Sequence, residues 1–360
     1  MEPIVIARAP GHLSLGWDEP PAAAGVDVGE RQAICAAIST YAYTIVSPCS
    51  ANDVRISVAG CHTLPWYMPQ DAAWGGELTL PRAILRLFGT REGLSIFLST
   101  QAPVGIGLGL AGSLAVSMIK ALAFSCGLDL DPREVAELAC SVGAEAESPR
   151  STAPCQYAAA SGGLSWVGMS DGRLKATPIR TTLEARHSLA KHLMLFGQPC
   201  ATHPLDREGE DGAAEGVPES AVAAYLTASQ NENRRARAAI ERGDWAELGD
   251  LLERGWRERN RLVGMDADNP LSQGLSAARA AGAYGGKGTG RRGGLLMLLC
   301  PDERQDAVTE AMDERDLRRL PLTLEMEGVQ VMEAVPHTKF LPAAPAFEPA
   351  FAGGQAFPMR

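Results

Sequence analysis

Short runs of apolar and β-branched residues in the first half of the chain predict β-strands. They contain Ile, Val, Thr and Tyr at a density that suits a pleated surface. The first run ends at a proline, which predicts a strand that feeds a turn. The expected strands are Pro3–Pro10, Gln32–Ser47, Asp53–Ala59, Leu94–Ser99 and Gly162–Val167.

Helical periodicity begins after residue 113. Apolar side chains recur there at every fourth residue, and Gly127 then supplies a C-cap. A further helix begins at Asp131, since Pro132 suits the first helical position and Glu134 can reach back to the cap. The apolar stripe of the first of these helices consists of Leu114, Met118, Leu122 and Cys126, and we expect it to lie in the core.

Asp206–Pro218 is an acidic and turn-rich segment that predicts a mobile loop. After it, long helical patterns replace the short strand-like runs. Two long helices are expected next, at Ala221–Arg242 and Trp245–Leu262, the second capped by Asp244. A β-α-β order then predicts a sheet backed by helices. The remaining elements are a strand at Leu295–Cys300, a helix at Glu303–Met312, strand-like pieces at Pro321–Met326 and Val329–Val335, and a Pro/Ala/Phe-rich tail at Pro342–Arg360.

The run Pro103–Ser113 (PVGIGLGLAGS) is a glycine-rich turn that opens a helix. Such a turn points backbone N–H groups and the positive end of the helix dipole at an anion, so it predicts phosphate binding. It lacks the Lys of a P-loop. The Rossmann spacing at Gly107–Gly112 is a weak match, because Asp131 opens a helix instead of ending a second strand. A second glycine-rich loop is expected far downstream, at 285–294 (GGKGTGRRGG).

Composition narrows the class of protein. At 360 residues the chain can hold two domains, and its formal net charge of −10 argues against nucleic acid as the main partner. No apolar stretch is long enough to predict a membrane span, and no secretory signal is visible. The eight cysteines show no C-x-x-C pair and no metal-ligand spacing, so we expect buried thiols in a reducing cytoplasm.

The ordered motifs resemble the GHMP kinases, a family that includes galactokinase, homoserine kinase and mevalonate kinase, and most of all its heptose 7-phosphate kinase branch. The match spans nearly the whole chain. It rests on Arg8-Ala9-Pro10, the Pro103–Gly109 core, Gln156–Gly163, Gly285–Gly290 and Glu327-Gly328-Val329, in the same order. In addition, Trp256 and Leu262 lie where that branch has a W-x-x-K-x-x-L helix, with Arg259 at the Lys position.

This resemblance implies an α+β protein with the two-domain GHMP kinase fold, in which an N-terminal ribosomal-protein-like domain precedes a C-terminal ferredoxin-like domain. We expect the domains at 1–185 and 186–341, followed by the tail 342–360. The implied reaction transfers the γ-phosphate of ATP to the hydroxyl of a small molecule, with Mg²⁺ bridging the phosphates. In the heptose branch the acceptor is the anomeric hydroxyl of a sugar phosphate.

The resemblance also implies a set of site residues. The nucleotide phosphates are expected over Pro103, Gly105, Gly107, Leu108, Gly109, Ala111, Gly112 and Ser113. The acceptor is expected at His12, Asp18, Gln156, Tyr157, Lys287, Thr289 and Gly290. Catalytic roles are assigned to Arg8, Cys155, Arg291 and Arg292, and Mg²⁺ would be held by Ser113 together with Glu145.

The sequence departs from the family pattern at the positions that bind the metal, supply the base and bind the sugar. The serine-rich turn that follows the family's first glycine loop is Leu110-Ala111-Gly112-Ser113 here, which leaves one hydroxyl. The Gln-Asp pair that supplies the base in the heptose branch is Pro154-Cys155, so Cys155 stands at the base position. The metal-binding Glu falls by spacing at Gly143, and the sugar-binding G-G-G-T-D-L-P stretch is contracted to Gly16–Pro20.

Several of these residues have structural alternatives. Cys155 is either a reactive thiolate or a small packing residue, and a lone Cys among Pro and Ala favours packing. His12 is evenly balanced between a hydrogen bond to substrate and a structural role. Trp17 suits packing better than stacking on a sugar. Asp18 aligns with the sugar-binding acid of the heptose branch, so we expect it to orient the acceptor.

Two functions are open from the sequence. The leading hypothesis is a cytoplasmic GHMP-type kinase that uses ATP to phosphorylate a heptose or octose phosphate, in a secondary-metabolite or nucleotide-sugar pathway. The alternative is a degenerate GHMP-fold protein that binds a phosphorylated ligand, or assists a partner enzyme, without turnover. Neither hypothesis predicts a nucleic-acid or membrane partner, and a homodimer stays open.

Overall fold

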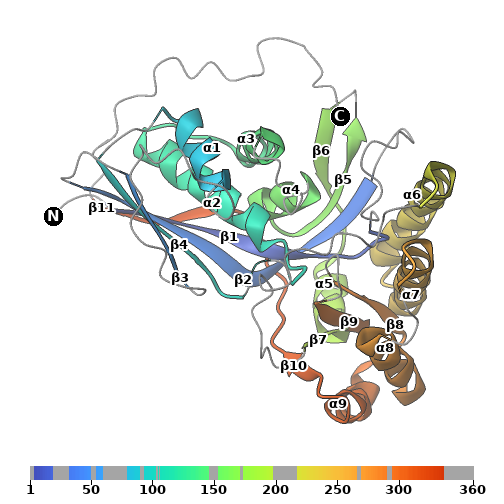
Figure 1. Ribbon diagram of the computed structural model, residues 1–360. Helices are drawn as coiled ribbons and strands as arrows, with labels where there is room; N and C mark the ends of the chain where they lie inside the picture. The colour runs from blue at the N-terminus through green and yellow to red at the C-terminus, as the bar shows by residue number, and fades with distance from the viewer. Residues whose placement is uncertain are drawn as a thin grey trace.

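The computed structural model contains two β-sheets and the helices that cover them (Figure 1). It describes residues 4–18, 32–49, 54–59, 79–89, 93–102, 104, 106–145, 153–170, 173–197, 217–265, 269–289 and 294–335. Most of the predicted acidic loop and the whole predicted tail lie outside these residues. The same holds for the site candidates Pro103, Gly105, Gly290, Arg291 and Arg292.

The first sheet has seven strands among the described residues, with β11, β1, β2, β4 and β3 side by side in that order. β5 pairs with the first part of β2, and β6 pairs with β5. All these pairings are antiparallel except that of β3 with β4. The strands are β1 (Ile4–Ser14), β2 (Gln32–Pro48), β3 (Val54–Ala59), β4 (Leu94–Thr100), β5 (Leu164–Ser170), β6 (Arg173–Pro178) and β11 (Gln330–Val335). Each strand predicted in the first half of the chain is confirmed.

β1 continues beyond the proline at which its end was predicted. Its register with β2 shifts between Pro10 and Gly11, because Pro10 has no N–H to donate to the ladder, and pairing resumes up to Ser14. The absence of a side chain at Gly11 lets the glycine-rich run approach, since a Cβ there would lie 2.8 Å from the carbonyl oxygen of Leu108. The extended β1 therefore carries His12 and Ser14 past the start of this run.

Helices cover one face of the first sheet (Figure 1). Alternate residues of β1, such as Val5, Ala7 and Ala9, are buried beneath them in one hydrophobic core. The predicted stripe of α2 lies in this core, where Met118 and Leu122 are almost fully buried. The covering helices are α1 (Thr79–Leu87), α2 (Leu110–Ser125), α3 (Pro132–Glu145) and α4 (Ala153–Ser161).

The second sheet is antiparallel, and its four strands lie in the order β10-β7-β9-β8 among the described residues. Its strands are β7 (Leu193–Gly197), β8 (Gly285–Gly288), β9 (Leu295–Leu299) and β10 (Arg318–Leu320). Its helices are α5 (Leu183–His192), α6 (Glu219–Arg242), α7 (Trp245–Leu262), α8 (Pro270–Ala281) and α9 (Gln305–Asp313), which the short 3-10 helix Asp302–Arg304 precedes. None of the described helices is long and apolar enough to cross a membrane.

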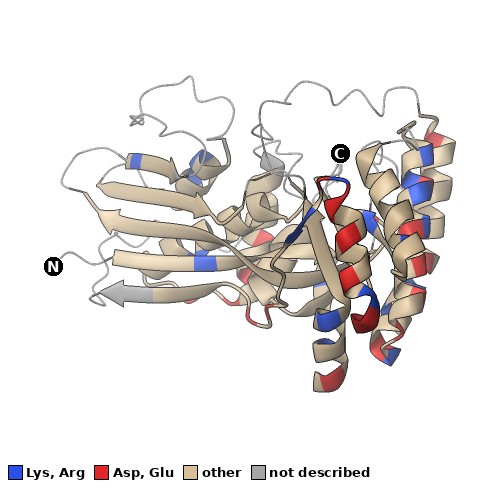
Figure 2. Cartoon of the chain, turned by 90° about the horizontal axis from the view of Figure 1, so that it is seen from below, with Lys and Arg blue, Asp and Glu red and all other residues tan. Residues whose placement is uncertain are grey.

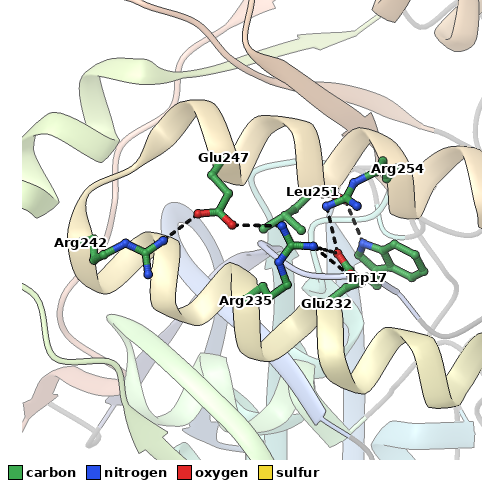
Figure 3. Close-up of polar contacts among 7 residues, drawn as sticks. All are labelled: Trp17, Glu232, Arg235, Arg242, Glu247, Leu251 and Arg254. Carbon is green, nitrogen blue, oxygen red and sulfur yellow. Dashed lines mark hydrogen bonds and ion pairs between the residues drawn. The ribbon is translucent and has the colours of Figure 1, made fainter.

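Charged side chains gather on the helices of the second half (Figure 2). On α6 and α7 they form a network, in which Arg235 pairs with both Glu232 and Glu247 while Arg254 reaches Glu232 (Figure 3). One exposed pair contributes only about 0–1 kcal/mol, and a network is worth more because its geometry is shared. These pairs hold the two helices side by side, and both helices contact the site described below.

Two sequence predictions are wrong in the second half. The downstream glycine motif was expected to be a loop, but Gly285–Gly288 is the buried strand β8. A Cβ at Gly286 would clash with Met297 of β9, so glycine here serves close packing of the strand. Pro321–Met326 is not a strand. Only Leu324 bridges to Ile38, because the segment divides its hydrogen bonds between β2 and the turn before β5.

β11 returns to the first sheet and pairs with β1. The expected second domain, 186–341, therefore contains a strand of the first sheet. The domain boundaries themselves stay a prediction.

The capping box predicted at the start of α3 is confirmed and can be tested. The N–H of Glu134 donates to Asp131 Oδ1, and the N–H of Asp131 donates to Glu134 Oε2, both at 2.8 Å. We expect Asp131→Ala to lower the free energy of unfolding by about 1 kcal/mol, measured by urea denaturation. Asp131→Asn is the control, since Asn also caps helices, and an equal loss in both variants would contradict the capping role.

Candidate functional site

The two glycine-rich motifs meet at the junction of the two sheets. The hydroxyl of Thr289, which follows β8, donates to the carbonyl oxygen of Ile106 at 2.9 Å. Gly294 packs on the same residue, since a Cβ there would lie 2.5 Å from the Ile106 oxygen. Thr289 is buried in this conformation, and its predicted contact with the acceptor stays a prediction. Its side chain ties the second sheet to the first glycine-rich run.

The first glycine-rich run leads into the N-terminus of α2, as predicted. Gly109 is the N-cap residue with φ +67, a left-handed conformation that favours glycine, and no side chain caps this end of the helix. The backbone N–H groups of the first turn and the helix dipole are thus arranged to favour an anion. This end of α2 fits the phosphates of a nucleotide.

Side chains of the run, however, do not add hydroxyls to this end. Leu108 and Leu110 lie in the hydrophobic core between the sheets. Ser113 is fully buried, and its hydroxyl donates to the carbonyl oxygen of Pro10 at 2.7 Å. Its predicted roles in nucleotide and Mg²⁺ binding therefore do not agree with this conformation. The side chain of Glu145, the other predicted ligand, lies outside the described part, and no group of His, Cys, Asp or Glu suited to a metal is found within that part.

A buried ammonium group from the second sheet reaches the end of β1. Lys287 Nζ donates to Asp18 Oδ2 at 2.8 Å, to the Gly16 carbonyl oxygen at 2.7 Å and to Ser14 Oγ at 3.2 Å. An ammonium has three protons to donate, so these three acceptors satisfy it. Lys287 thus holds the predicted acceptor-binding loop in place, and its predicted direct contact with substrate stays a prediction.

Asp18 is held in its ionised form. Burial alone would raise its pKa, but the charge and hydrogen bond of Lys287, a hydrogen bond from Ser14 and the charge of Arg259 together lower it. The carboxylate is 29% exposed, while Lys287 is 3% exposed. Asp18 can therefore present an ionised oxygen to a ligand, and at neutral pH that oxygen accepts hydrogen bonds.

The loop that carries Asp18 is fixed by α6 and α7. The backbone N–H of Trp17 donates to Asn233 Oδ1 at 2.7 Å, and its indole N–H donates to the Leu251 carbonyl oxygen at 2.8 Å (Figure 3). The ring of Trp17 stacks on Tyr225 at 5.6 Å, and Tyr225 donates its hydroxyl proton to the Asp18 carbonyl oxygen. Trp17 is thus a packing residue, the alternative that the sequence favoured.

His12 and Cys155 lie together against the first turn of α2. A Cβ at Gly109 would clash with the His12 ring, and a Cβ at Gly112 would lie 2.9 Å from Cys155 Cβ. The side chains of His12 and Cys155 are hydrogen-bonded to each other, and each residue is 8% exposed. Burial would lower the pKa of His12, but Cys155 and Asp18 outweigh it and raise that pKa.

Other predicted site residues do not join this group. Arg8 lies over the ring of Tyr41 and donates to Gln330, at the β11 edge of the sheet. Gln156 is fully buried, as is most of Tyr157, whose hydroxyl donates to the Leu174 carbonyl oxygen. Helical periodicity explains the difference, because Cys155 packs on α2 beside His12 while its neighbours Gln156 and Tyr157 are turned into the core.

The sequence also missed residues of the site. Ser14 and Asn233 bind the buried ammonium and the loop, yet nothing in the motifs identified them. The only sequence signal for Ser14 is its place two residues after His12 on an extended strand, which puts both on the same face. Asn233 carries no signal, because its role depends on how α6 packs on the loop.

Comparisons with known proteins agree with this architecture. Residues 79–163 match the family model described as the GHMP kinases N terminal domain. A D-glycero-alpha-D-manno-heptose 7-phosphate kinase from Campylobacter jejuni is 28% identical over 231 residues, which cover 63% of this chain and 68% of that protein. A mevalonate kinase from Thermococcus gammatolerans is 24% identical over 68% of this chain and 71% of its own length.

Solved structures share the fold. A D-glycero-D-manno-heptose 1-phosphate kinase from Bacteriodes thetaiotaomicron aligns with a TM-score of 0.73 and 19% identity, over 91% of this chain and 99% of that one. A Lactococcus lactis galactokinase, crystallised with galactose, aligns with a TM-score of 0.70 and 12% identity, over 91% of this chain and 95% of its own. The molecule thus has the α+β, two-domain fold that these solved structures share. The resemblance to the GHMP kinases that the sequence motifs predicted is confirmed by the family model at residues 79–163 and by the heptose 7-phosphate kinase relative.

The buried ion pair yields a stability prediction. We expect Lys287→Met to lower the free energy of unfolding by up to about 3 kcal/mol, because it leaves a partly buried carboxylate without its cation. The 29% exposure of Asp18 keeps the loss at the lower end of the range for buried pairs. Urea denaturation near neutral pH measures it, and the double variant Lys287→Met/Asp18→Asn should recover part of the loss.

The same variant should change how stability depends on pH. A carboxyl whose folded pKa lies below its unfolded value of about 3.9 stabilises the fold above that value, and the contribution is lost as the pH falls through the folded pKa. Because Lys287 is a main cause of the lowered pKa of Asp18, Lys287→Met should lose less stability in this acidic window than the wild type. Identical acid dependence in both proteins would contradict the assignment.

Proposed function

We propose that this protein is an ATP-dependent sugar kinase that phosphorylates the anomeric hydroxyl of a heptose- or octose-type sugar phosphate. One observation carries the proposal. The ring of His12 packs on Gly109 at the uncapped N-terminus of α2, which fits phosphates, and its pKa is raised by the ionised Asp18, which fits a sugar hydroxyl. The similarity to a heptose 7-phosphate kinase supports this substrate class.

The described residues can supply the positioning that phosphoryl transfer needs. Backbone N–H groups at the start of α2 would bind phosphate oxygens, and their dipoles are fixed before the substrate arrives. Asp18 would accept a hydrogen bond from the sugar, and Lys287 keeps that carboxylate in place. Holding both substrates in this way lowers the barrier through proximity and orientation.

The proposed reaction also implies a donor, an acceptor and a cellular location. ATP and a sugar phosphate are the expected donor and acceptor, and we propose a cytoplasmic location because both belong there. Mg²⁺ is expected to neutralise the phosphates in this family, but the hydroxyl of Ser113 donates to Pro10, and the side chain of Glu145 lies outside the described part. No step of the proposal is therefore assigned to a protein-bound metal.

A second candidate function is ligand binding without turnover. It is favoured by the chemistry of the turn after Gly109, where Leu110, Ala111 and Gly112 offer no hydroxyl and Ser113 uses its own within the protein. In this alternative the site would bind a phosphorylated sugar, and ATP would neither bind nor react.

Two measurements separate the candidates. Incubating the protein with labelled ATP, Mg²⁺ and a panel of heptose and octose phosphates should label the sugar at its anomeric position. Thermal unfolding should also shift upward with ATP and Mg²⁺, because a ligand that binds the folded state stabilises it. No transfer to any acceptor would refute the kinase, and a shift with sugar phosphates but none with ATP would favour the binding protein.

Asp18 provides a residue-level check on the acceptor site. Asp18→Asn keeps an acceptor for Lys287 but removes the charge that a sugar hydroxyl would use. We expect KM for the sugar phosphate to rise about tenfold or more, since a hydrogen bond to a charged group is worth about 1.5–3 kcal/mol. The ATP-induced thermal shift should be unchanged. A variant that loses ATP binding instead would mean that Asp18 contacts the nucleotide.

A further inference from the structure

His12 has one ring nitrogen available for its hydrogen bond with Cys155. Nδ1 of His12 is buried and has no hydrogen-bond partner among the described residues, so the bond to Cys155 is made at the other ring nitrogen, Nε2. An imidazole that bonds a thiol through one nitrogen can accept its proton, which yields an imidazolium and a thiolate. Cys155 is not part of a disulfide, so its sulfur can take either form.

Cys155 lies near the N-termini of two helices. Cys155 is the third residue of α4, and its Cβ packs on Gly112 in the first turn of α2. Helix N-termini favour negative charge, and they are among the environments that lower the pKa of a cysteine thiol. His12 supplies the third such influence from β1. A lone cysteine would be a packing residue, but this cysteine has a charge-stabilising neighbour on each side.

The other titratable groups near the pair come from every element that packs on it. Burial, and after it negative charge on Cys155, raises the pKa of both Cys35 on β2 and Cys140 on α3, so these two thiols stay protonated. Asp18 favours the imidazolium, while Lys287 on β8 opposes it. Within the described part, the proton that Cys155 releases therefore has His12 as its acceptor.

We propose that His12 and Cys155 form an imidazolium–thiolate pair, and that the Cys155 thiolate accepts the proton of the sugar hydroxyl during phosphoryl transfer. This second part rests on the proposed kinase function. As the O–H proton passes to Sγ, the sugar oxygen forms its bond to the γ-phosphorus of ATP, and the bond to the leaving ADP oxygen breaks. The resulting thiol returns its proton to solvent between turnovers, so protons and electrons balance.

The pair is tested without any substrate. A thiolate absorbs in the far ultraviolet where a thiol does not, so titrating the folded protein reports the ionisation directly. We expect the thiolate to form at a clearly lower pH than an ordinary thiol does. Cys155→Ser should abolish this transition and His12→Gln should raise its pKa. Cys126→Ala, at the remote end of α2, is the control and should leave the transition in place.

Kinetics then test the role of the thiolate. Loss of a general base slows turnover by about 10²–10⁴-fold, so Cys155→Ala should lower kcat by that factor with little change in KM. Cys155→Asp should restore much of the rate, because a carboxylate also accepts a proton. In His12→Gln, the acidic limb of the pH–rate profile should move to higher pH, in step with the absorbance titration.

The outcomes separate the two proposals. An absent thiolate transition in a folded protein overturns the pair, even if sugar kinase activity is found. A wild-type kcat in Cys155→Ala overturns the base role. A clear thiolate transition in a protein that transfers phosphate to no acceptor refutes the kinase function and with it the base role, and the pair is then supported as a reactive thiol in a binding protein.

Discussion

The buried ammonium of Lys287 is the constraint on which the site depends. It belongs to β8 of the second sheet, but its acceptors are Ser14, Gly16 and Asp18, at the end of β1 and in the loop that follows. Removing a charge from water costs several kcal/mol unless good hydrogen bonds replace the solvent. The buried ammonium is therefore stable only while the second sheet stays in this position against the end of β1. The carboxylate of Asp18 keeps its place and its charge for the same reason.

Glycine makes the other close contacts possible. β8 can lie against α7 because neither Gly249 nor Gly285 has a side chain between the two backbones. On the first sheet, Gly109 and Gly112 are one helical turn apart on α2, and they leave room for His12 and Cys155 respectively. The glycine-rich run thus does more than expose backbone N–H groups to an anion. It also creates the space in which the side chains of His12 and Cys155 meet.

Local signals in the sequence predicted the parts of the fold that local interactions decide. The strands of the first half, the capping box at Asp131 and the N-cap at Asp244 depend on neighbours along the chain, and all are confirmed. The motif at 285–290 was misread as a loop because glycine content alone cannot distinguish a flexible turn from a strand packed on both faces. Gln156 and Tyr157 were assigned to the acceptor by their place in a motif, yet α4 turns them into the core. Tertiary packing decides which face of a helix is turned toward the site, and a sequence motif does not show it.

The proposed thiolate pair also explains how this site can tolerate a cysteine where a heptose kinase has an acid. A buried carboxylate brings a permanent charge, whose burial must be offset by a fixed cation such as Lys287 beside Asp18. A thiol and an imidazole in contact are neutral together, and proton transfer between them creates two charges without changing their sum. The desolvation cost is then offset by their mutual attraction and by the N-termini of α2 and α4. A base built in this way needs no further buried cation, which suits a pocket where Lys287 already has all its acceptors.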